Sequence, residues 1–169
     1  MIVGYLVGGL LVLVLAPSII YLITSLYDNV LRLEIIPNPT IRWIIIAVLL
    51  LIGIIYAISS LVIQNRVGEG GPVELGKIEI SPKTKHLVVS GPYRNTRNPM
   101  LFGAFLLYLA YALLINSTTA LVLVCVLFVF MLTVVVPMEE KRLLKDFGDQ
   151  YVAYRKRVSM FIPWCQRKM

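Results

Sequence analysis

The sequence predicts an all-α integral membrane protein with about four transmembrane helices, and three observations support this fold class. Of the 169 residues, 59% are hydrophobic, which exceeds the apolar share of a soluble domain. Several uncharged runs are long enough to cross a bilayer, which needs about 20 residues in a helix. The basic residues behind the net charge of +7 flank these runs. We therefore expect the lipid bilayer as partner and no nucleic acid.

Two spans are predicted in the first part of the chain. Residues 2–27 carry no charged side chain and form the first span. A polar connector over residues 28–42 contains a Pro-Asn-Pro sequence, which ends a helix on either side. Residues 43–63 form the second span, in which Gly53 permits close packing against another helix.

The longest polar stretch, residues 64–98, is predicted to be a loop. Its partial match to a phosphate-binding loop at residues 71–77 is rejected, because Ile78 occupies the position of the magnesium-binding hydroxyl. Residues 78–80 and 87–89 have the composition of two short strands and are predicted to pair as a small β-hairpin.

A tight helical hairpin is predicted next. Asn98 is a favourable N-cap and Pro99 a favourable first helical residue, so a third span is expected over residues 99–115. The polar, uncharged sequence Asn116-Ser117-Thr118 then turns the chain into a fourth span over residues 119–136.

Pro137 is expected to break the fourth span and to start a helix at the membrane interface. Glu139 and Glu140 lie in its first turn, and Gly148 is expected to end it. A last short helix then runs to about Val158. Apolar and charged side chains alternate here, which predicts that these helices lie along the membrane surface.

The segments form one domain with an N-terminal two-helix part (1–63), a loop (64–98) and a hairpin with a C-terminal segment (99–169). Six lysines and arginines lie between Gln64 and Pro99 and eight after Pro137, whereas the connector between the first two spans has two. With four spans, both rich segments fall on one side, which the positive-inside rule assigns to the cytoplasm. The N-terminus, the long loop and the C-terminus are therefore expected there.

Metal binding is not expected. The chain has two cysteines and one histidine, too few for a zinc site or a disulfide framework. Cys125 and Cys165 are therefore predicted to be plain apolar thiols.

The predicted hairpin brings two polar segments together. Because its helices are antiparallel, the helix start at Asn98 and the Glu139-Glu140 pair are expected to be neighbours. Arg94 and Arg97 would then lie beside carboxylates and beside the free amides of a helix N-terminus, which attract anions. The alternative is that the arginines anchor the helix at lipid headgroups and the glutamates complement the helix dipole.

Two motifs carry a resemblance to a known family. The first fits the pattern Leu-Val-x-x-Gly-Pro-Tyr-x-x-x-Arg-His-Pro-Met-Tyr-x-Gly at Leu87, Val88, Gly91, Pro92, Tyr93, Arg97, Pro99, Met100 and Gly103. The second, a glutamate pair followed by Phe-Gly-x-x-Tyr-x-x-Tyr, is matched at Glu139, Glu140, Phe147, Gly148, Tyr151 and Tyr154. Together they resemble the isoprenylcysteine carboxyl methyltransferase and phospholipid methyltransferase superfamily. Asn98 replaces the histidine of that pattern and Leu101 its second tyrosine.

The resemblance implies a membrane enzyme that uses S-adenosylmethionine. It assigns cofactor contacts to Leu87, Gly91, Tyr93, Arg97, Asn98, Pro99, Glu139 and Glu140, with Arg97 and Asn98 also as catalytic residues. Arg97 and the amides near Asn98 would take the cofactor carboxylate, and Glu139 or Glu140 the ammonium group or ribose. Tyr154 and Arg157 are candidates for binding the second substrate.

The expected reaction is methyl transfer to the polar end of an amphiphilic, isoprenoid-like acceptor at the cytoplasmic membrane face, most like isoprenylcysteine carboxyl O-methylation. Asn98 is compatible with it, because an amide takes up no proton near neutral pH and a carboxylate is already an anion. Three alternatives stay open. They are N-methylation of a phospholipid amine, with His86 as the candidate base, a sterol-reductase-like enzyme that uses NADPH, and a non-catalytic membrane protein.

Overall fold

The computed structural model describes residues 8–28, 34–68 and 85–163. Its elements are η1 (Leu11–Leu15), α2 (Ala16–Tyr27), α3 (Pro39–Ile63), η2 (Gln64–Gly68), η3 (Gly91–Arg94), α4 (Pro99–Ile115), α5 (Thr118–Phe130), η4 (Met131–Val135) and α6 (Val136–Arg157). The described ranges contain no strand, so the all-α prediction is confirmed there. Residues 78–80 of the predicted β-hairpin lie outside the described residues, and residues 87–89 are irregular.

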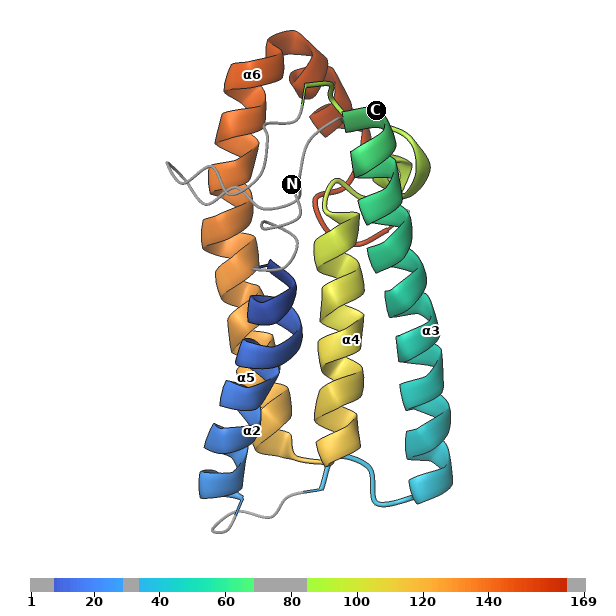
Figure 1. The fold of residues 1–169 in the computed structure, drawn as a ribbon, viewed down its shortest axis with the longest axis vertical. Helices are drawn as coiled ribbons and strands as arrows, with labels where there is room; N and C mark the ends of the chain where they lie inside the picture. The colour runs from blue at the N-terminus through green and yellow to red at the C-terminus, as the bar shows by residue number, and fades with distance from the viewer. Residues whose placement is uncertain (1–7, 29–33, 69–84, 164–169) are drawn as a thin grey trace.

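The helices run side by side as a bundle (Figure 1). Three of them are long and apolar enough to cross a membrane, namely Gly8–Tyr27, Pro39–Gly68 and Thr118–Arg157. The fourth, α4, is apolar throughout but has 17 residues. The predicted spans are therefore all helices, and three of them reach full membrane-spanning length.

Helices α3 and α4 approach closely because each has a glycine at the contact. A Cβ atom added to Gly103 would lie 2.8 Å from the backbone nitrogen of Ala57 and 2.8 Å from the carbonyl oxygen of Gly53. A Cβ atom on Gly53 would lie 3.0 Å from Leu107. Small residues allow such close packing in membrane helices, where apolar burial gives little driving force. The prediction for Gly53 is confirmed, and Gly103 is its partner.

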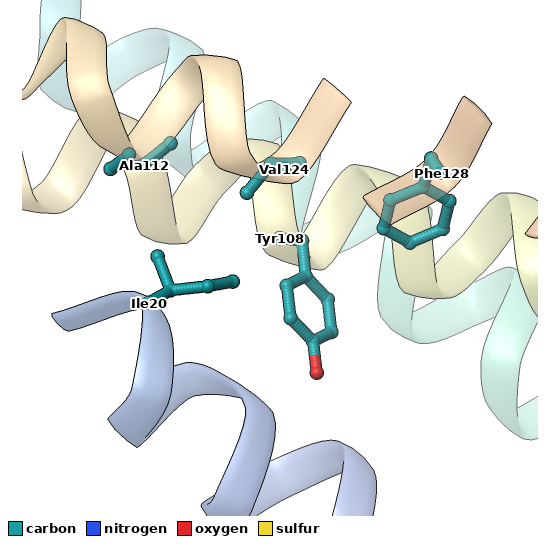
Figure 2. Packing of buried hydrophobic residues seen from close by; sticks show 6 residues of the cluster. Ile20, Tyr108, Ala112, Val124 and Phe128 are labelled. Carbon is teal, nitrogen blue, oxygen red and sulfur yellow. The ribbon is translucent and has the colours of Figure 1, made fainter. Parts of the chain in front are cut away.

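On its other side, α4 packs against α2 and α5. The buried centre of this contact contains Ile20, Tyr108, Ala112, Val124 and Phe128 (Figure 2). The rings of Tyr108 and Phe128 meet edge to face, with centroids 5.7 Å apart. Helix α4 is thus enclosed between α3 on one side and α2 with α5 on the other.

The predicted turn between α4 and α5 is present. Asn116 has a left-handed backbone with φ of 56°, and the Ser117 side chain accepts a hydrogen bond from the Ala120 amide, which caps α5. The Asn116 side chain accepts from the Ile36 amide at 3.1 Å and donates to the Glu34 carboxylate at 3.2 Å. The turn therefore also fixes the start of the segment that leads into α3.

Pro137 does not break the fourth span, so that prediction is wrong. The helix continues from Thr118 to Arg157 through the π-helical turn η4, which ends two residues before the proline. There the Val136 amide bonds to the Met131 carbonyl, five residues earlier. The wider turn moves the preceding carbonyl away from the proline ring, which relieves the clash that ends ordinary helices.

Gly148, predicted to end a helix, is the point at which α6 bends and then continues to Arg157. Its φ of 50° and ψ of −125° are non-helical and are accessible to glycine at little cost. Beyond the bend, the last part of α6 turns back toward the start of α4 (Figure 1) and ends at Arg157. This return positions the C-terminal residues of the candidate site.

Candidate functional site

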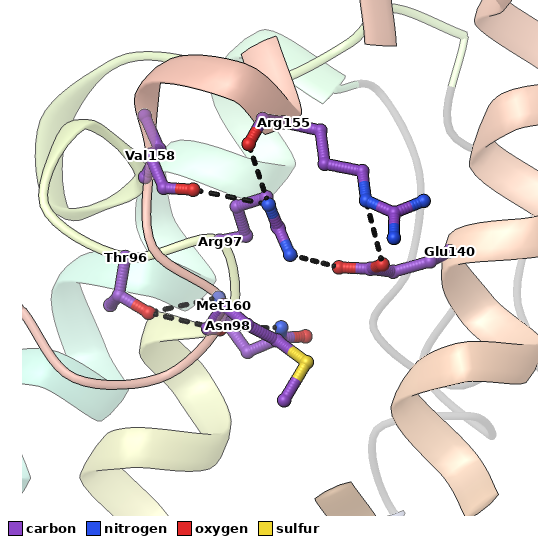
Figure 3. Close-up of polar contacts among 7 residues, drawn as sticks. All are labelled: Thr96, Arg97, Asn98, Glu140, Arg155, Val158 and Met160. Carbon is purple, nitrogen blue, oxygen red and sulfur yellow. Dashed lines mark hydrogen bonds and ion pairs between the residues drawn. The ribbon is translucent and has the colours of Figure 1, made fainter. Parts of the chain in front are cut away.

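A buried ion pair lies where the loop before α4 meets the N-terminal part of α6. The Arg97 guanidinium is 2.7 Å from the Glu140 carboxylate, and the two side chains are 9% and 11% exposed. The Arg155 guanidinium lies 3.6 Å from the second oxygen of Glu140 (Figure 3). The start of α4 and the glutamate pair are therefore close in space, as predicted.

Arg97 also binds the C-terminal end of α6. Its Nη1 atom donates to the carbonyl oxygens of Arg155 at 2.9 Å and Val158 at 3.1 Å. The last carbonyls of a helix lack amide partners and carry partial negative charge. The planar guanidinium can therefore bridge the loop, the start of α6 and its end at the same time.

The segment after α6 lies along the start of α4. The Arg97 amide donates to the Ser159 carbonyl at 2.9 Å. The Met160 carbonyl accepts hydrogen bonds from Asn98 Nδ2 at 2.8 Å and from Thr96 Oγ1 at 3.3 Å (Figure 3). Next to it, the Phe161 ring packs edge to face against the rings of Phe102 and Phe105, with both centroid distances 5.6 Å. These contacts position residues 158–161 beside the ion pair.

Asn98 occupies the N-cap position of α4, and Pro99 follows in the first turn, as predicted. The side chain of Asn98 does not cap the helix, however, because its amide group donates to Met160 instead. The Thr96 hydroxyl accepts a hydrogen bond from the Asn98 amide at 3.3 Å, and Pro99 has no amide hydrogen. The amides of Met100 and Leu101, in the first turn of α4, are therefore the candidates for binding an anionic group.

Two tyrosines connect this cluster to η2, which continues α3. Tyr154 donates its hydroxyl hydrogen to the Tyr93 carbonyl at 2.7 Å, and the Tyr93 hydroxyl donates to Gln64 Oε1 at 3.1 Å. Burial, and secondarily the negative charge of Glu139, raises the pKa of Tyr93, so its hydroxyl stays neutral and donates. Tyr93 and Tyr154 therefore act as neutral hydrogen-bond donors here.

The two glutamates differ in environment. Glu139 is 39% exposed and pairs with Arg142 one turn further along α6. Glu140 is directed into the cluster, between Arg97 and Arg155. Of the two carboxylates, Glu140 is the one placed to meet a ligand at the start of α4.

The other predicted site residues lie around this centre or outside it. Gly91 has φ of +59°, and a Cβ atom there would lie 3.1 Å from Ile63, so the backbone turn requires glycine. Leu87 is half-buried in the preceding segment. Arg157 is exposed and donates to the Ala153 carbonyl at 3.3 Å, so its polar contact is local.

The motifs did not predict that Arg155 and residues 158–160 belong to the site. No motif marks Arg155, and residues 158–160 contribute through backbone carbonyls, which leave no trace in a sequence. Among the described residues no group of three or more histidines, cysteines, aspartates or glutamates could hold a metal ion.

The fold and this site define an all-α integral membrane protein with a buried charged cluster at one end of its helices. The family model described as phospholipid methyltransferase matches residues 41–150. The chain therefore belongs to the phospholipid methyltransferase family, in agreement with the resemblance of its motifs. The match includes Arg97, Asn98 and Glu140, whereas Arg155 and residues 158–160 of the cluster lie beyond it.

One curated relative adds to this assignment. Methanethiol S-methyltransferase 1 of Bradyrhizobium diazoefficiens is 30% identical to the chain over 90 residues. The aligned region covers 53% of this chain and 30% of the relative, so the chain spans under a third of that protein. No solved structure matches the chain. Family and relative together support a methyltransferase with membrane-spanning helices.

Proposed function

We propose that the protein transfers a methyl group from S-adenosylmethionine to the polar end of an amphiphilic acceptor at the cytoplasmic face of the membrane. The observation that carries this proposal is the buried Arg97–Glu140 pair beside the uncapped start of α4. This pair places a positive and a negative charge next to the backbone amides at the start of α4. The apolar sequence of α4 begins at the same position. Membership in a methyltransferase family supports methyl transfer as the reaction.

The chemistry of this cluster fits the cofactor. Its amino acid part carries a carboxylate and an ammonium group, and when bound it supplies an electrophilic methyl group on a sulfonium. The amides at the start of α4 suit the carboxylate, and Glu140 suits the ammonium or ribose. One buried atom of the pair, Arg97 Nε, has no hydrogen-bond partner among the described residues, so this N–H group remains able to donate.

The remaining assigned residues shape this position. We also assign Leu87, Gly91, Tyr93 and Pro99 to cofactor contacts, with Glu139 adding negative charge near them. Asn98 and Arg97 connect the motif to the C-terminal segment through Met160 and Val158. In this proposal Tyr154 and Arg157 bind the polar end of the acceptor.

The acceptor is proposed to be an anion when it reacts. Glu140 and Glu139 are both in ion pairs, Tyr93 is held neutral, and Asn98 cannot take up a proton. None of these groups is suited to remove a proton from an ammonium group. A carboxylate needs no base, which favours isoprenylcysteine-like carboxyl O-methylation over N-methylation of a phospholipid amine.

A thiol is the second candidate acceptor, and the relative favours it. That protein's name states that it methylates methanethiol on sulfur. A thiolate resembles a carboxylate in reacting as an anion. Both candidates share an anionic nucleophile and differ in the atom that receives the methyl group.

The side of the membrane is proposed from charge. Six basic residues between Gln64 and Pro99 and eight after Pro137 contrast with two in residues 28–42. The positive-inside rule therefore supports a cytoplasmic position for the site, the N-terminus and the C-terminus.

The acceptor class can be tested with radiolabelled S-adenosylmethionine and protein in lipid nanodiscs. We expect label transfer to S-farnesylthiopropionate, a carboxylate, or to decanethiol, and none to phosphatidylethanolamine. Glu140→Gln should abolish most of the transfer, whereas Asp149→Asn, an exposed carboxylate of the same helix, should not. Transfer to the amine alone would contradict the proposed acceptor, and absence of transfer together with binding of NADPH would favour a reductase.

A further inference from the structure

An irregular segment, residues 158–163, follows α6 and lies against the start of α4. Three successive carbonyl oxygens of this segment bind the proposed site: two accept from Arg97, and the third, that of Met160, accepts from Asn98. No regular hydrogen-bond ladder fixes the path of an irregular segment, so its carbonyls stay in place only if other contacts secure it. The geometry of the site therefore depends on those contacts.

The aromatic ring of Phe161 reaches past these polar contacts into the apolar part of the bundle. It packs edge to face against the rings of Phe102 and Phe105 of α4, with both centroid distances 5.6 Å. Phe105 lies six residues after Pro99, which corresponds to about 9 Å along the helix axis. Apolar burial alone has little power to fix a position within a membrane, whereas edge-to-face packing of rings is directional. Phe161 therefore anchors the segment below the polar cluster.

The two rings that receive Phe161 are themselves fixed from the neighbouring helices. Phe102 packs against Tyr56 of α3, and Phe105 packs against Phe128 of α5, both with ring centroids 4.9 Å apart. Phe161 thus completes a row of rings that connects α3, α4 and α5. Through this row, three helices of the bundle determine where the segment lies.

A simple lipid anchor would look different. In an anchor of that kind, both apolar side chains of the segment would face the lipid. Only Ile162 does so, because it is 62% exposed. The ring of Phe161 is directed toward the bundle instead.

We infer that Phe161 is a positioning residue for the proposed reaction. Its ring fixes the segment after α6 relative to the bundle, and the carbonyls of that segment keep Arg97 and Asn98 in the geometry that the site requires. The inference rests on the proposed function, because it concerns residues assigned there to cofactor binding and catalysis. Phe161 lies beyond the family match, which ends at residue 150.

The coupling between the ring and the site can be measured without a ligand. The Arg97 amide donates to the Ser159 carbonyl at 2.9 Å, so its hydrogen exchange reports whether the segment stays in place. In detergent-purified protein, Phe161→Ala should exchange the amides of residues 95–98 faster than the wild type.

Phe128→Ala is the matched control. The Phe128 ring is buried and belongs to the same row, but it packs against Phe105 and Tyr108, one step away from the segment. This variant should melt at a lower temperature, as loss of a buried ring does, yet keep wild-type exchange at residues 95–98. Equal acceleration in both variants would show a general loosening of the bundle and would overturn the inference.

Binding of S-adenosylhomocysteine gives the functional readout. In calorimetry well below the melting temperature of each variant, Phe161→Ala should bind about tenfold more weakly than the wild type, since small displacements of binding groups have effects of this size. Phe128→Ala should bind like the wild type. Phe161→Leu keeps an apolar side chain without a ring and should show a smaller change in the same direction, so it replaces Phe161→Ala if that variant does not fold.

The outcomes separate this inference from the proposed function. Unchanged hydrogen exchange in Phe161→Ala overturns the inference, whether or not the protein binds S-adenosylhomocysteine. Faster exchange with unchanged affinity shows that the ring serves the fold alone, so the positioning role is wrong while the use of a methyl donor stands. If the wild type does not bind S-adenosylhomocysteine, the proposed function fails and the positioning role with it. Faster exchange together with selectively weaker binding in Phe161→Ala supports both.

Discussion

The hydroxyl of Tyr108 donates a hydrogen bond to the carbonyl of Val12, across the contact between α4 and the N-terminal helix. Val12 lies in the π-helical turn η1, in which the Ala16 amide bonds to Leu11 five residues earlier. In the same register the amide of residue 17 would bond to Val12, but Pro17 has no amide hydrogen. Tyr108 therefore supplies the donor that the proline lacks, within an apolar region where an unpaired carbonyl is costly.

Removal of this hydroxyl should weaken the bundle. We expect Tyr108→Phe to destabilise the protein by about 0.6 to 2 kcal/mol, the range of hydrogen bonds between membrane helices. Thermal unfolding in detergent measures the effect. Tyr27→Phe, an exposed tyrosine at the end of α2, is the matched control and should melt like the wild type. Equal melting of Tyr108→Phe and the wild type would show that the Val12 carbonyl needs no donor.

A methyl group at Gly103 should separate α3 from α4. Its Cβ atom would meet two backbone atoms at 2.8 Å, and backbone cannot move aside as a flexible side chain can. We expect Gly103→Ala to cost about 1 to 3 kcal/mol, as overpacking of a tight contact does. In Gly9→Ala the added atom meets nothing within 4 Å, so this variant should be neutral or slightly stabilised. Similar melting temperatures for the two variants would contradict the close contact.

Gly148 should matter for ligand binding as well as for stability. Its positive φ is strained for any side chain, although a Cβ atom there would meet nothing within 4 Å. Gly148→Ala should therefore cost about 1 to 3 kcal/mol through backbone strain alone. Because a straighter α6 would move Arg155 and Tyr151 away from Glu140, the affinity for S-adenosylhomocysteine should also fall. Retention of full affinity at a lowered melting temperature would show that the bend serves stability only.

The Arg97–Glu140 pair should show strong coupling in a double-mutant cycle. Arg97→Met alone leaves the buried Glu140 with only the more distant Arg155, a loss for which about 3 to 5 kcal/mol is typical. Adding Glu140→Leu removes the uncompensated charge, so the double variant should be less destabilised than the sum of the two single variants. Additive effects on the unfolding free energy would show that the two charges do not stabilise each other.

Much of this architecture follows from local sequence signals. The long uncharged runs predicted the membrane helices. Asn98-Pro99 predicted the start of α4, and Asn116 to Thr118 predicted the turn into α5. Gly148 marked the bend because few other residues adopt its backbone angles. The hairpin topology then predicted correctly that Arg97 and the glutamate pair are neighbours.

Other features depend on tertiary contacts that the sequence does not display. Pro137 normally ends a helix, and a π-helical turn that precedes it has no sequence signature. Asn98 has the composition of an N-cap, but its side chain donates to the Met160 carbonyl 62 residues away. The contact of Arg97 with the carbonyls of Arg155 and Val158 likewise needs the bend at Gly148 before it can form.

The central claim is that the buried cluster at the start of α4 holds the methyl donor, and binding of S-adenosylhomocysteine to detergent-purified protein tests it most directly. Calorimetry should show binding to the wild type, no binding of NADPH, and at least about tenfold weaker binding to Glu140→Gln, as expected for loss of a charged hydrogen bond. Asp149→Asn should bind like the wild type. Absence of binding to the wild type, or equal affinity of the wild type and Glu140→Gln, would contradict the account.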